Sequence, residues 1–168
     1  MPGTFDVDHT DMPVGIYSPG SDRINGCDLV TVDVRCVIPY EEKILTNKEL
    51  HTVEHILAVE IAKECDKENS QVRKIYWGPM GCQTGFYLLA ATCHRNQAVG
   101  ICSMLKKACE NVLQAETYKT PANTKKECGH YNTLYGTAKE VKWIIQRIAE
   151  SCEAVIYNEE FCAYTEID

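Results

Sequence analysis

Residues 50–57, Leu-His-Thr-Val-Glu-His-Ile-Leu, constrain the fold and chemistry of this chain more than any other stretch. In a helix, side chains three and four positions apart lie on one face, so His51, Glu54 and His55 would point into the same volume. The spacing His-x-x-Glu-His is the inverted form of the zincin motif, in which two neutral imidazoles bind a divalent metal and the glutamate moves protons. The segment therefore predicts a helix that carries part of a metal site.

The residues around this motif favour a helix. Thr46, followed three positions later by Glu49, has the pattern of a capping box, which predicts that the helix begins there. An apolar stripe at helical spacing continues beside the polar triplet: Leu50, Val53, Leu57, Ile61. Two histidines and a glutamate on a solvated helix face would show the same spacing, so the rest of the chain decides between the two interpretations.

Composition limits the class of protein. At 168 residues, 45% hydrophobic and 24% charged, the chain resembles an ordinary globular protein, and we expect one domain over residues 1–168. The formal net charge of -7, without a block of lysines or arginines, argues against a nucleic-acid or anionic-membrane partner. The sequence has neither an apolar run long enough to span a bilayer nor the pattern of a signal peptide, so we expect a cytoplasmic location.

The chain contains ten cysteines, spread irregularly and without a CxxC pair. In this context we expect reduced thiols rather than a disulfide framework. Most would act as small apolar core residues; Cys152, for example, continues the helical spacing of the apolar residues before it. Cys82 and Cys128 differ, because each lies next to a glycine in a segment that predicts a loop.

Three segments have the pattern of strands. Residues 29–39 alternate apolar and polar side chains, and residues 72–77 and 86–93 flank a turn rich in glycine. Asp33 and Arg35 share the polar face of the first strand. From the strand alone we interpret them as a solvated ion pair, because exposed pairs are common and weak.

Two further helices are expected after the strands. One covers residues 96–116, and the other begins at a second capping box, over residues 137–140, and ends near Cys152. Residues 4–26 are rich in Pro, Gly and Asp and predict an arm with turns. Residues 154–157 predict a last short strand.

A metal site built on the histidine helix needs at least one ligand from elsewhere in the fold. Cys128 and Cys82 are the leading thiol candidates. With one thiolate bound, a fourth position stays open for water or substrate, as catalytic sites require, and with both bound the site would be closed and structural. Sequence spacing leaves both arrangements open. A mixed imidazole and thiolate site suits zinc and is also compatible with ferrous iron.

Five sequence blocks together carry a resemblance to one family. They are Phe5-Asp6-Val7-Asp8-His9-Thr10, Asp33-Val34-Arg35, His51-Thr52-Val53-Glu54-His55, Pro79-Met80-Gly81-Cys82-Gln83-Thr84-Gly85-Phe86-Tyr87 and Glu127-Cys128-Gly129. In order and spacing they resemble the signature blocks of S-ribosylhomocysteine lyase, the LuxS family, from Phe5 to about Tyr131. Five blocks in one order are far more specific than a single motif.

The resemblance implies a single-domain α+β fold of the LuxS, inverzincin-like type, in which an antiparallel sheet packs against helices. It also implies a homodimer with two active sites at the subunit interface. Matched residue by residue, His51, His55 and Cys128 would be the metal ligands, with Fe2+ as the native metal and Zn2+ as a common substitute. Glu54 and Cys82 would be the acid/base pair.

The same match implies that Arg35, His9 and Thr4, where the family often has serine, help to hold the substrate, in part from the neighbouring subunit. The reaction implied is cleavage of S-ribosylhomocysteine to homocysteine and 4,5-dihydroxy-2,3-pentanedione, the precursor of autoinducer-2. Such a product would serve quorum sensing, or the reaction would remove a by-product of the methyl cycle.

The residue chemistry agrees with this reaction. A thioether leaves readily as a thiolate when it lies β to a carbonyl, so the carbonyl of the opened ribose must migrate along the sugar by repeated enolisation. A metal with an open position stabilises the charge that enolisation creates. Glu54 and a Cys82 thiolate near the metal are suited to move the protons, and a nearby Arg35 would lower the pKa of that thiol.

Two alternatives from other classes remain at this point. A metallopeptidase-like hydrolase would use Glu54 to activate a metal-bound water, but inverted zincins normally take a distal glutamate as the third ligand. A non-catalytic metal-binding module would close its site with both cysteines.

Four positions depart from the pattern of the family. Tyr76 stands where an aspartate is usual, Gly78 where serine is usual, Cys36 where phenylalanine is usual and Tyr40 where asparagine is usual. These departures surround the substrate pocket. We expect them to affect substrate affinity and rate rather than the type of reaction.

Overall fold

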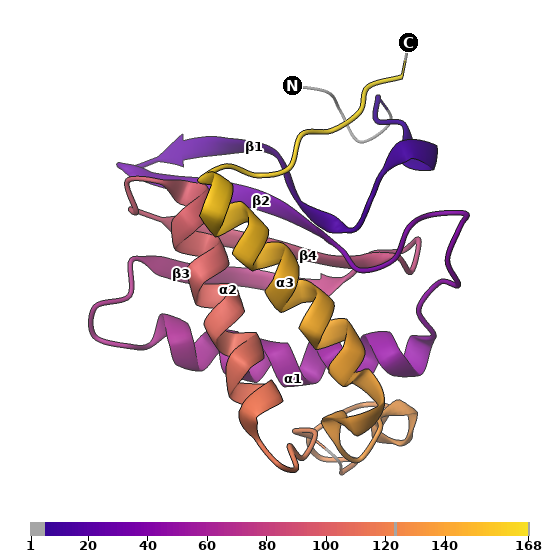
Figure 1. Cartoon of the computed structure of the whole chain (residues 1–168). Helices are drawn as coiled ribbons and strands as arrows, with labels where there is room; N and C mark the ends of the chain where they lie inside the picture. The colour runs from indigo at the N-terminus through magenta and orange to yellow at the C-terminus, as the bar shows by residue number, and fades with distance from the viewer. Residues whose placement is uncertain (1–5, 123, 168) are drawn as a thin grey trace.

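The computed structural model of the protein describes residues 6–122 and 124–167, and it has the α+β architecture expected from the sequence (Figure 1). Four strands form an antiparallel sheet in the order β1-β2-β4-β3. The strands are β1 (Gly15–Ile24), β2 (Cys27–Arg35), β3 (Val72–Pro79) and β4 (Gly85–Thr92). The α-helices are α1 (Asn47–Cys65), α2 (Gln97–Gln114) and α3 (Lys142–Asn158). Short 3-10 helices are η1 (His9–Asp11), η2 (Tyr131–Thr133) and η3 (Ala138–Val141).

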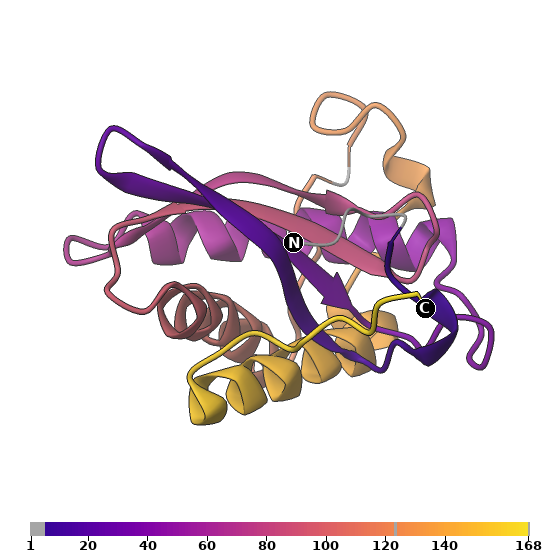
Figure 2. The ribbon, with the colours of Figure 1, turned by 90° about the horizontal axis from the view of Figure 1, so that it is seen from above.

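The sheet has one covered face and one open face. Helices α2 and α3 pack together on the same side of the sheet, and α1 runs along β3 (Figures 1 and 2). Alternate side chains of β2 and β4 are buried in the core beneath the helices: Val30, Val32, Val34, Phe86, Leu88, Ala90. The residues between them on the other face include several that are only half-buried: Leu29, Thr31, Tyr87, Leu89, Ala91. This period of two is the burial pattern of a sheet covered on one face.

Helix α1 begins as its sequence predicts. The backbone N–H of Glu49 donates to Oγ1 of Thr46 at 3.2 Å, and the N–H of Thr46 donates to Oε2 of Glu49 at 2.8 Å. This capping box satisfies backbone donors that the first turn of a helix leaves without partners. The histidine motif therefore lies within regular helix, in the second turn after the cap and the start of the third.

The prediction of an arm over residues 4–26 is wrong in part, because β1 occupies Gly15–Ile24. Its low content of strand-forming residues is offset by pairing with β2 along most of its length. The register shifts between Tyr17 and Gly20, around Pro19, and β1 lies at the edge of the sheet, where a proline removes no ladder hydrogen bond.

The prediction for the C-terminal part also needs correction. Residues 154–157, expected as a strand, lie within α3, which continues to Asn158 and ends at Glu159 in the left-handed conformation. Thr137 accepts a hydrogen bond from the backbone of Lys139 and begins η3 instead of forming the expected capping box with Glu140.

The two ends of the described chain lie together beside β1. Val7 forms an antiparallel bridge with Glu166, and the backbone N–H of Cys162 donates to the carbonyl of Ile16 at 2.9 Å. Residues 6–122 and 124–167 contain no helix with both the length and the apolar character needed to cross a bilayer.

Candidate active site

Three potential metal ligands converge near the start of α1. His51 and His55 lie one turn apart on this helix, and their Nε2 atoms are 3.1 Å apart. Cys128 comes from the long connection between α2 and α3, and its Sγ atom lies 3.4 Å from Nε2 of His51. The three ligand atoms lie within 4.8 Å of one another, so the helix face and the loop thiol meet in one place.

The spacing of these atoms fits a divalent metal. Tetrahedral zinc, with bonds of about 2.0–2.1 Å to nitrogen and 2.3 Å to sulfur, separates two nitrogens by roughly 3.3 Å and nitrogen from sulfur by roughly 3.6 Å. The separations of 3.1 Å and 3.4 Å are close to these values. In the part of the chain that the structure describes, Cys82 does not join this group, which leaves a position for water or substrate and argues against the closed structural site.

Thr133 holds His51 in the tautomer that a metal requires. Its hydroxyl donates to the carbonyl oxygen of His130 at 2.8 Å. Oγ1 also lies 2.7 Å from Nδ1 of His51, and because its proton is already used, it accepts the Nδ1 proton. A proton on Nδ1 leaves Nε2, which faces His55 and Cys128, with a free lone pair. Burial, together with the charge of His55, lowers the pKa of His51 and favours the neutral imidazole.

The loop that carries Cys128 is held by contacts with α1, at its base and within its own turn. The backbone N–H of Tyr135 donates to Oγ1 of Thr52 at 2.9 Å, next to His51 on the helix. At the base of the loop, Lys119 forms a bridge with Thr137. The backbone N–H of His130 donates to Sγ of Cys128 at 3.4 Å, which fixes the position of the thiol within its own turn.

Glu54 lies on the same face of α1, beside the histidines. It is partly exposed and borders a hollow of about 440 Å³, whose lining residues are Asn47, Leu50, His51, Glu54, Pro79, His130 and Thr133. A carboxylate that borders both a metal cluster and an open hollow is placed to exchange protons with a bound molecule.

A second hollow, of about 270 Å³, lies at the end of β2. Its lining residues are His9, Arg35, Pro39, Tyr40, Glu42, Ile44, Cys82 and Thr84. The sheet register places Arg35 directly opposite Gly85, and a Cβ atom on Gly85 would overlap the carbonyl of Val34. The glycine therefore allows the close approach of β4 that brings the turn before it against Arg35.

Arg35, Cys82 and Thr84 form a hydrogen-bonded group in this hollow. Nη1 of Arg35 donates to Oγ1 of Thr84 at 2.7 Å and lies 3.5 Å from Sγ of Cys82. Sγ of Cys82 lies 3.0 Å from Oγ1 of Thr84. Burial alone would raise the pKa of Cys82, but hydrogen bonds from the side chain and backbone of Thr84 and the charge of Arg35 outweigh it and lower the pKa.

The interpretation of Asp33 and Arg35 as a solvated pair is wrong. Nη2 of Arg35 lies 3.6 Å from Oδ2 of Asp33, and the two residues are only 3% and 6% exposed. The C-terminal segment covers them: Tyr164 hydrogen-bonds to Asp33 and stacks on Tyr17, with ring centroids 5.1 Å apart. Burial raises the pKa of Asp33, and the hydrogen bond from Tyr164 and the charge of Arg35 oppose that increase.

Two residues that contact Arg35, Cys82 or Asp33 were not predicted from the sequence. Thr84 lies within the block of residues 79–87 that contains Cys82, so its position in that motif was the available signal. Tyr164 lies far from the motifs, and only the fold brings it to Asp33. His9 lines the hollow, with Nδ1 2.8 Å from the carbonyl of Val7, whereas Thr4 lies outside the described residues and its role stays a prediction.

The two predicted proton-transfer residues border different hollows. Within the described residues, Glu54 and Cys82 do not hydrogen-bond to each other, and the hollows lie at either end of the turn that connects β3 to β4. Nε2 of Gln83 donates to Oδ1 of Asn47 at 2.6 Å and thereby joins this turn to the start of α1. A substrate long enough to reach both hollows would contact both residues.

The departures from the family pattern have structural reasons in two cases. A Cβ atom on Gly78 would overlap the ring and hydroxyl of Tyr76, so these two residues fit each other. Cys36 is buried in the core, and burial raises its pKa to about 12, which leaves it a neutral thiol. Tyr40 is 86% exposed and borders the hollow of Arg35.

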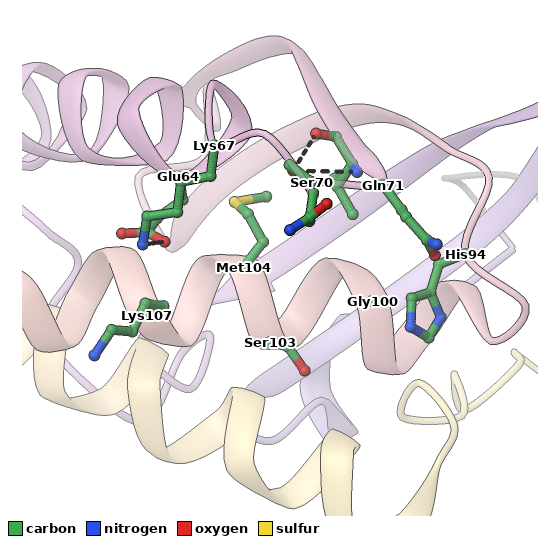
Figure 3. Close-up of a pocket in the computed structure, with 11 residues that line it drawn as sticks. Glu64, Lys67, Ser70, Gln71, His94, Gly100, Ser103, Met104 and Lys107 are labelled. Carbon is green, nitrogen blue, oxygen red and sulfur yellow. Dashed lines mark hydrogen bonds and ion pairs between the residues drawn. The ribbon is translucent and has the colours of Figure 1, made fainter.

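A third hollow, of about 630 Å³, lies between the end of α1, the start of β3 and α2, and its lining does not include the groups just described (Figure 3). Lys67 is paired there with Glu64, and His94 is held by the backbone of Asn96. These side chains are already satisfied within the protein, so we do not assign the chemistry to this hollow.

One family, described as S-Ribosylhomocysteinase (LuxS), matches residues 3–159. The S-ribosylhomocysteine lyase of Desulfotalea psychrophila is 34% identical over 131 residues, which cover 78% of this chain and 79% of the relative. That of Borreliella burgdorferi is 33% identical over 132 residues (76% and 78%), and that of Finegoldia magna is 30% identical over 131 residues (78% and 79%).

Proposed function

This chain belongs to the S-ribosylhomocysteinase (LuxS) family, and from that premise we propose how its own residues divide the reaction between them. The protein is a metal-dependent carbon-sulfur lyase that acts on S-ribosylhomocysteine in autoinducer synthesis. One observation carries the assignment of roles. A His-His-Cys group with Glu54 beside it, and a separate thiol with a lowered pKa, border two hollows joined by one turn.

We assign the metal ligands to His51, His55 and Cys128. The proposed resident metal is Fe2+, with Zn2+ as a substitute, and the mixed imidazole and thiolate donor set is compatible with both. When bound, the metal supplies Lewis acidity that stabilises negative charge on the substrate oxygens during enolisation.

Cys82 and Glu54 are the proton-transfer residues of this proposal. The carbonyl of the opened ribose begins at the end of the sugar away from the thioether, so protons must move between neighbouring carbons and oxygens until the thioether lies β to the carbonyl. The Cys82 thiolate takes and returns carbon-bound protons, and Glu54 exchanges protons with the oxygens. General acid and base groups of this kind contribute about 10²–10⁴-fold each.

Cleavage follows from the position of the last carbonyl. Removal of the proton between that carbonyl and the thioether expels homocysteine as a thiolate, which then takes up a proton. The remaining enol rearranges to 4,5-dihydroxy-2,3-pentanedione. We propose that this product serves quorum sensing and that the reaction also returns homocysteine to the methyl cycle.

Arg35 and His9 hold the substrate in this scheme, and Thr4 is proposed to assist. Among the residues described, Nε of Arg35 is buried and has no hydrogen-bond partner, although Nη1 and Nη2 face Thr84 and Asp33. The guanidinium nevertheless borders the hollow beside Cys82, so its positive charge would attract an oxygen of the bound substrate.

We propose that the protein is a homodimer with its active sites at the subunit interface. The support is the open face of the sheet, where Leu29, Tyr87 and Leu89 are only half-buried, and Ile75 and Tyr76 on β3 are exposed. The hollow of Arg35 and Cys82 lies at the end of the two central strands that form this face. A second copy on this face would reach the edge of that hollow.

We also propose one domain over residues 1–168 and a cytoplasmic location. The sheet and the three α-helices share a continuous core, which supports the first proposal. The second is supported by the chemistry, because Cys82 and Cys128 must stay reduced, and the cytosol keeps thiols in that state.

The test is thiol release from S-ribosylhomocysteine by anaerobically purified protein loaded with Fe2+. We expect release by the native protein and a large loss in Cys82→Ala with its metal content unchanged. Absence of release from fully loaded, dimeric native protein would contradict the assignment of these residues. A peptide substrate serves as the second assay, and peptide hydrolysis that survives Cys82→Ala would favour the hydrolase alternative.

A further inference from the structure

Two thiols meet at the end of the sheet that lies away from Arg35. Cys27 is the first residue of β2, and Cys93 directly follows the last residue of β4. Their Sγ atoms are 2.6 Å apart, within about half an ångström of the length of a covalent S–S bond. Neither residue belongs to the metal group or lines the hollows assigned to the reaction.

The backbone already holds these residues in position. Asp28 pairs with Thr92 in the sheet register, so Cys27 and Cys93 occupy the next opposing positions. On the other side, Cys27 pairs with Ile24 of β1, and the backbone N–H of Cys93 donates to the carbonyl of Gln71 at 3.1 Å. Opposing residues of an antiparallel pair have Cβ atoms about 4.5–5.5 Å apart, which meets the range of disulfides at its upper end of about 4.5 Å. The two sulfur atoms of this pair already lie 2.6 Å apart, so only a small closure is needed.

Solvent access distinguishes this pair from another pair of thiols in the protein. Cys152 hydrogen-bonds to Cys102, but both are fully buried in the core, where a small oxidant does not reach them. Cys93 is exposed and Cys27 is partly exposed. Both thiols are therefore within reach of a small disulfide in solution.

We propose that Cys27 and Cys93 form a reversible intrachain disulfide by exchange with a low-molecular-weight aliphatic disulfide. The reaction of this enzyme releases a thiol of this kind, homocysteine, so its disulfide, homocystine, is the oxidant to which we assign the exchange. This choice of oxidant depends on the lyase reaction, whereas the thiol pair itself does not.

The exchange balances without a further reactant. The thiolate of one cysteine of the pair attacks one sulfur of homocystine, forms a mixed disulfide with it and releases one homocysteine thiolate. The other cysteine then loses its proton and attacks the protein sulfur of the mixed disulfide, which forms the intrachain bond and releases the second homocysteine. Two electrons pass from the cysteines to homocystine, and the two protons released by the cysteines appear on the two homocysteine molecules.

The bond would join positions 66 residues apart in the sequence. A cross-link over a loop of this length restricts the unfolded chain and stabilises the fold. For a chain of this size we expect the oxidised form to melt roughly 10 °C higher than the reduced form. Because the pair lies at the opposite end of β2 from Arg35, the rate of thiol release should not change.

The test is peptide mapping of the full-length, metal-loaded protein after incubation with homocystine and alkylation of the remaining thiols. Trypsin places Cys27 in the peptide of residues 24–35 and Cys93 in that of residues 75–95, which also contains Cys82. We expect these two peptides joined, at the mass of a disulfide, in native protein and in Cys82→Ala, and separate in Cys93→Ser. Cys102 and Cys152 are the control within the same sample. Because they are buried, they should remain reduced and be alkylated after denaturation.

Three results would overturn the proposal. One is a map in which Cys27 and Cys93 stay alkylated while Cys82 carries homocysteine. Another is a link that connects two chains, seen as a dimer-sized band on a non-reducing gel. The third is a joined peptide whose formation leaves the melting temperature unchanged. The mapping does not require turnover, so failure of the lyase assay and failure of this proposal can be told apart.

Discussion

The metal group and the Arg35–Cys82 group illustrate two ways in which a fold assembles reactive side chains. Two of the three proposed metal ligands come from neighbouring turns of α1, so the helix alone sets their separation. Arg35 and Cys82 come from β2 and from the turn before β4, and only the sheet register brings them together. The first group depends on local structure and one loop, and the second depends on the packing of the whole sheet.

The difference also concerns burial. Arg35 is almost completely buried and is held by Thr84 and Asp33, whereas the proposed metal ligands are partly exposed. Changes in the metal group should therefore affect metal binding more than folding. Changes in the Arg35–Cys82 group should affect both the proton affinity of Cys82 and the stability of the fold.

The largest effect is expected for His55→Ala. Removal of a direct ligand should reduce metal affinity by more than the about 10–100-fold typical of outer-shell changes and should abolish thiol release. Metal content after dialysis, measured by atomic emission, checks this result. His130→Ala is the matched control, because it removes an exposed imidazole from the same hollow and should retain the metal. Normal metal content in His55→Ala would refute the ligand assignment.

Glu54→Gln should separate chemistry from metal binding. The amide keeps the size of the carboxylate but cannot accept a proton, so turnover should fall about 10²–10⁴-fold while metal content stays normal. Single-turnover thiol release by the metal-loaded variant measures the loss. If the variant instead loses its metal, Glu54 is a ligand and the division of roles proposed above is wrong.

Thr133→Val tests how the loop prepares the metal group. Without the Oγ1 acceptor, His51 is no longer held with its proton on Nδ1, and metal affinity should fall about 10–100-fold. Chelator competition with Co2+ measures this affinity independently of turnover. Thr133→Ser should restore it, and Thr124→Val, which removes an exposed hydroxyl of the same loop, should leave it unchanged. Equal losses in both valine variants would point to general loosening of the loop.

The smallest effect is expected for Thr84→Val, in the Arg35–Cys82 group. The Thr84 hydroxyl lowers the pKa of Cys82, so its loss should move the midpoint of Cys82 alkylation to higher pH. Less thiolate is then present at neutral pH, and thiol release should slow in proportion. Alkylation rates against pH, with Cys82→Ala as background, provide the measurement. Thr92→Val, in the same strand but away from Cys82, should keep the native midpoint, and an unchanged midpoint in Thr84→Val would exclude a role for the hydroxyl.

The parts of the structure that the sequence predicted well are those set by local rules. The capping box of Thr46 and Glu49 and the spacing of the histidines predict α1 and its reactive face without reference to any other element. The α+β fold and the family followed from the order of the five motif blocks. The residues within each block lie close together in the sequence, whereas the order of the blocks extends from Phe5 to about Tyr131.

The parts that the sequence did not predict depend on distant contacts. Strand β1 contains Pro19 and several glycine and polar residues, and it is a strand because β2 pairs with it. The burial of Asp33 depends on Tyr164, more than 100 positions along the chain, and the contact of Cys27 with Cys93 depends on sheet register. Periodicity cannot reveal such contacts, because it reports which face a residue occupies but not what covers it.

The bridge between Val7 and Glu166 has a consequence for the topology of the chain. Because the two ends of the described chain lie side by side, a short linker would turn it into a nearly closed ring without moving any element. A ring can be opened elsewhere, and the exposed turn at Asn25 and Gly26 between β1 and β2 lies at the end of β2 opposite Arg35, although next to Cys27. The protein is therefore a suitable scaffold for circular permutation, in which the tail that covers Asp33 becomes an internal, tethered segment.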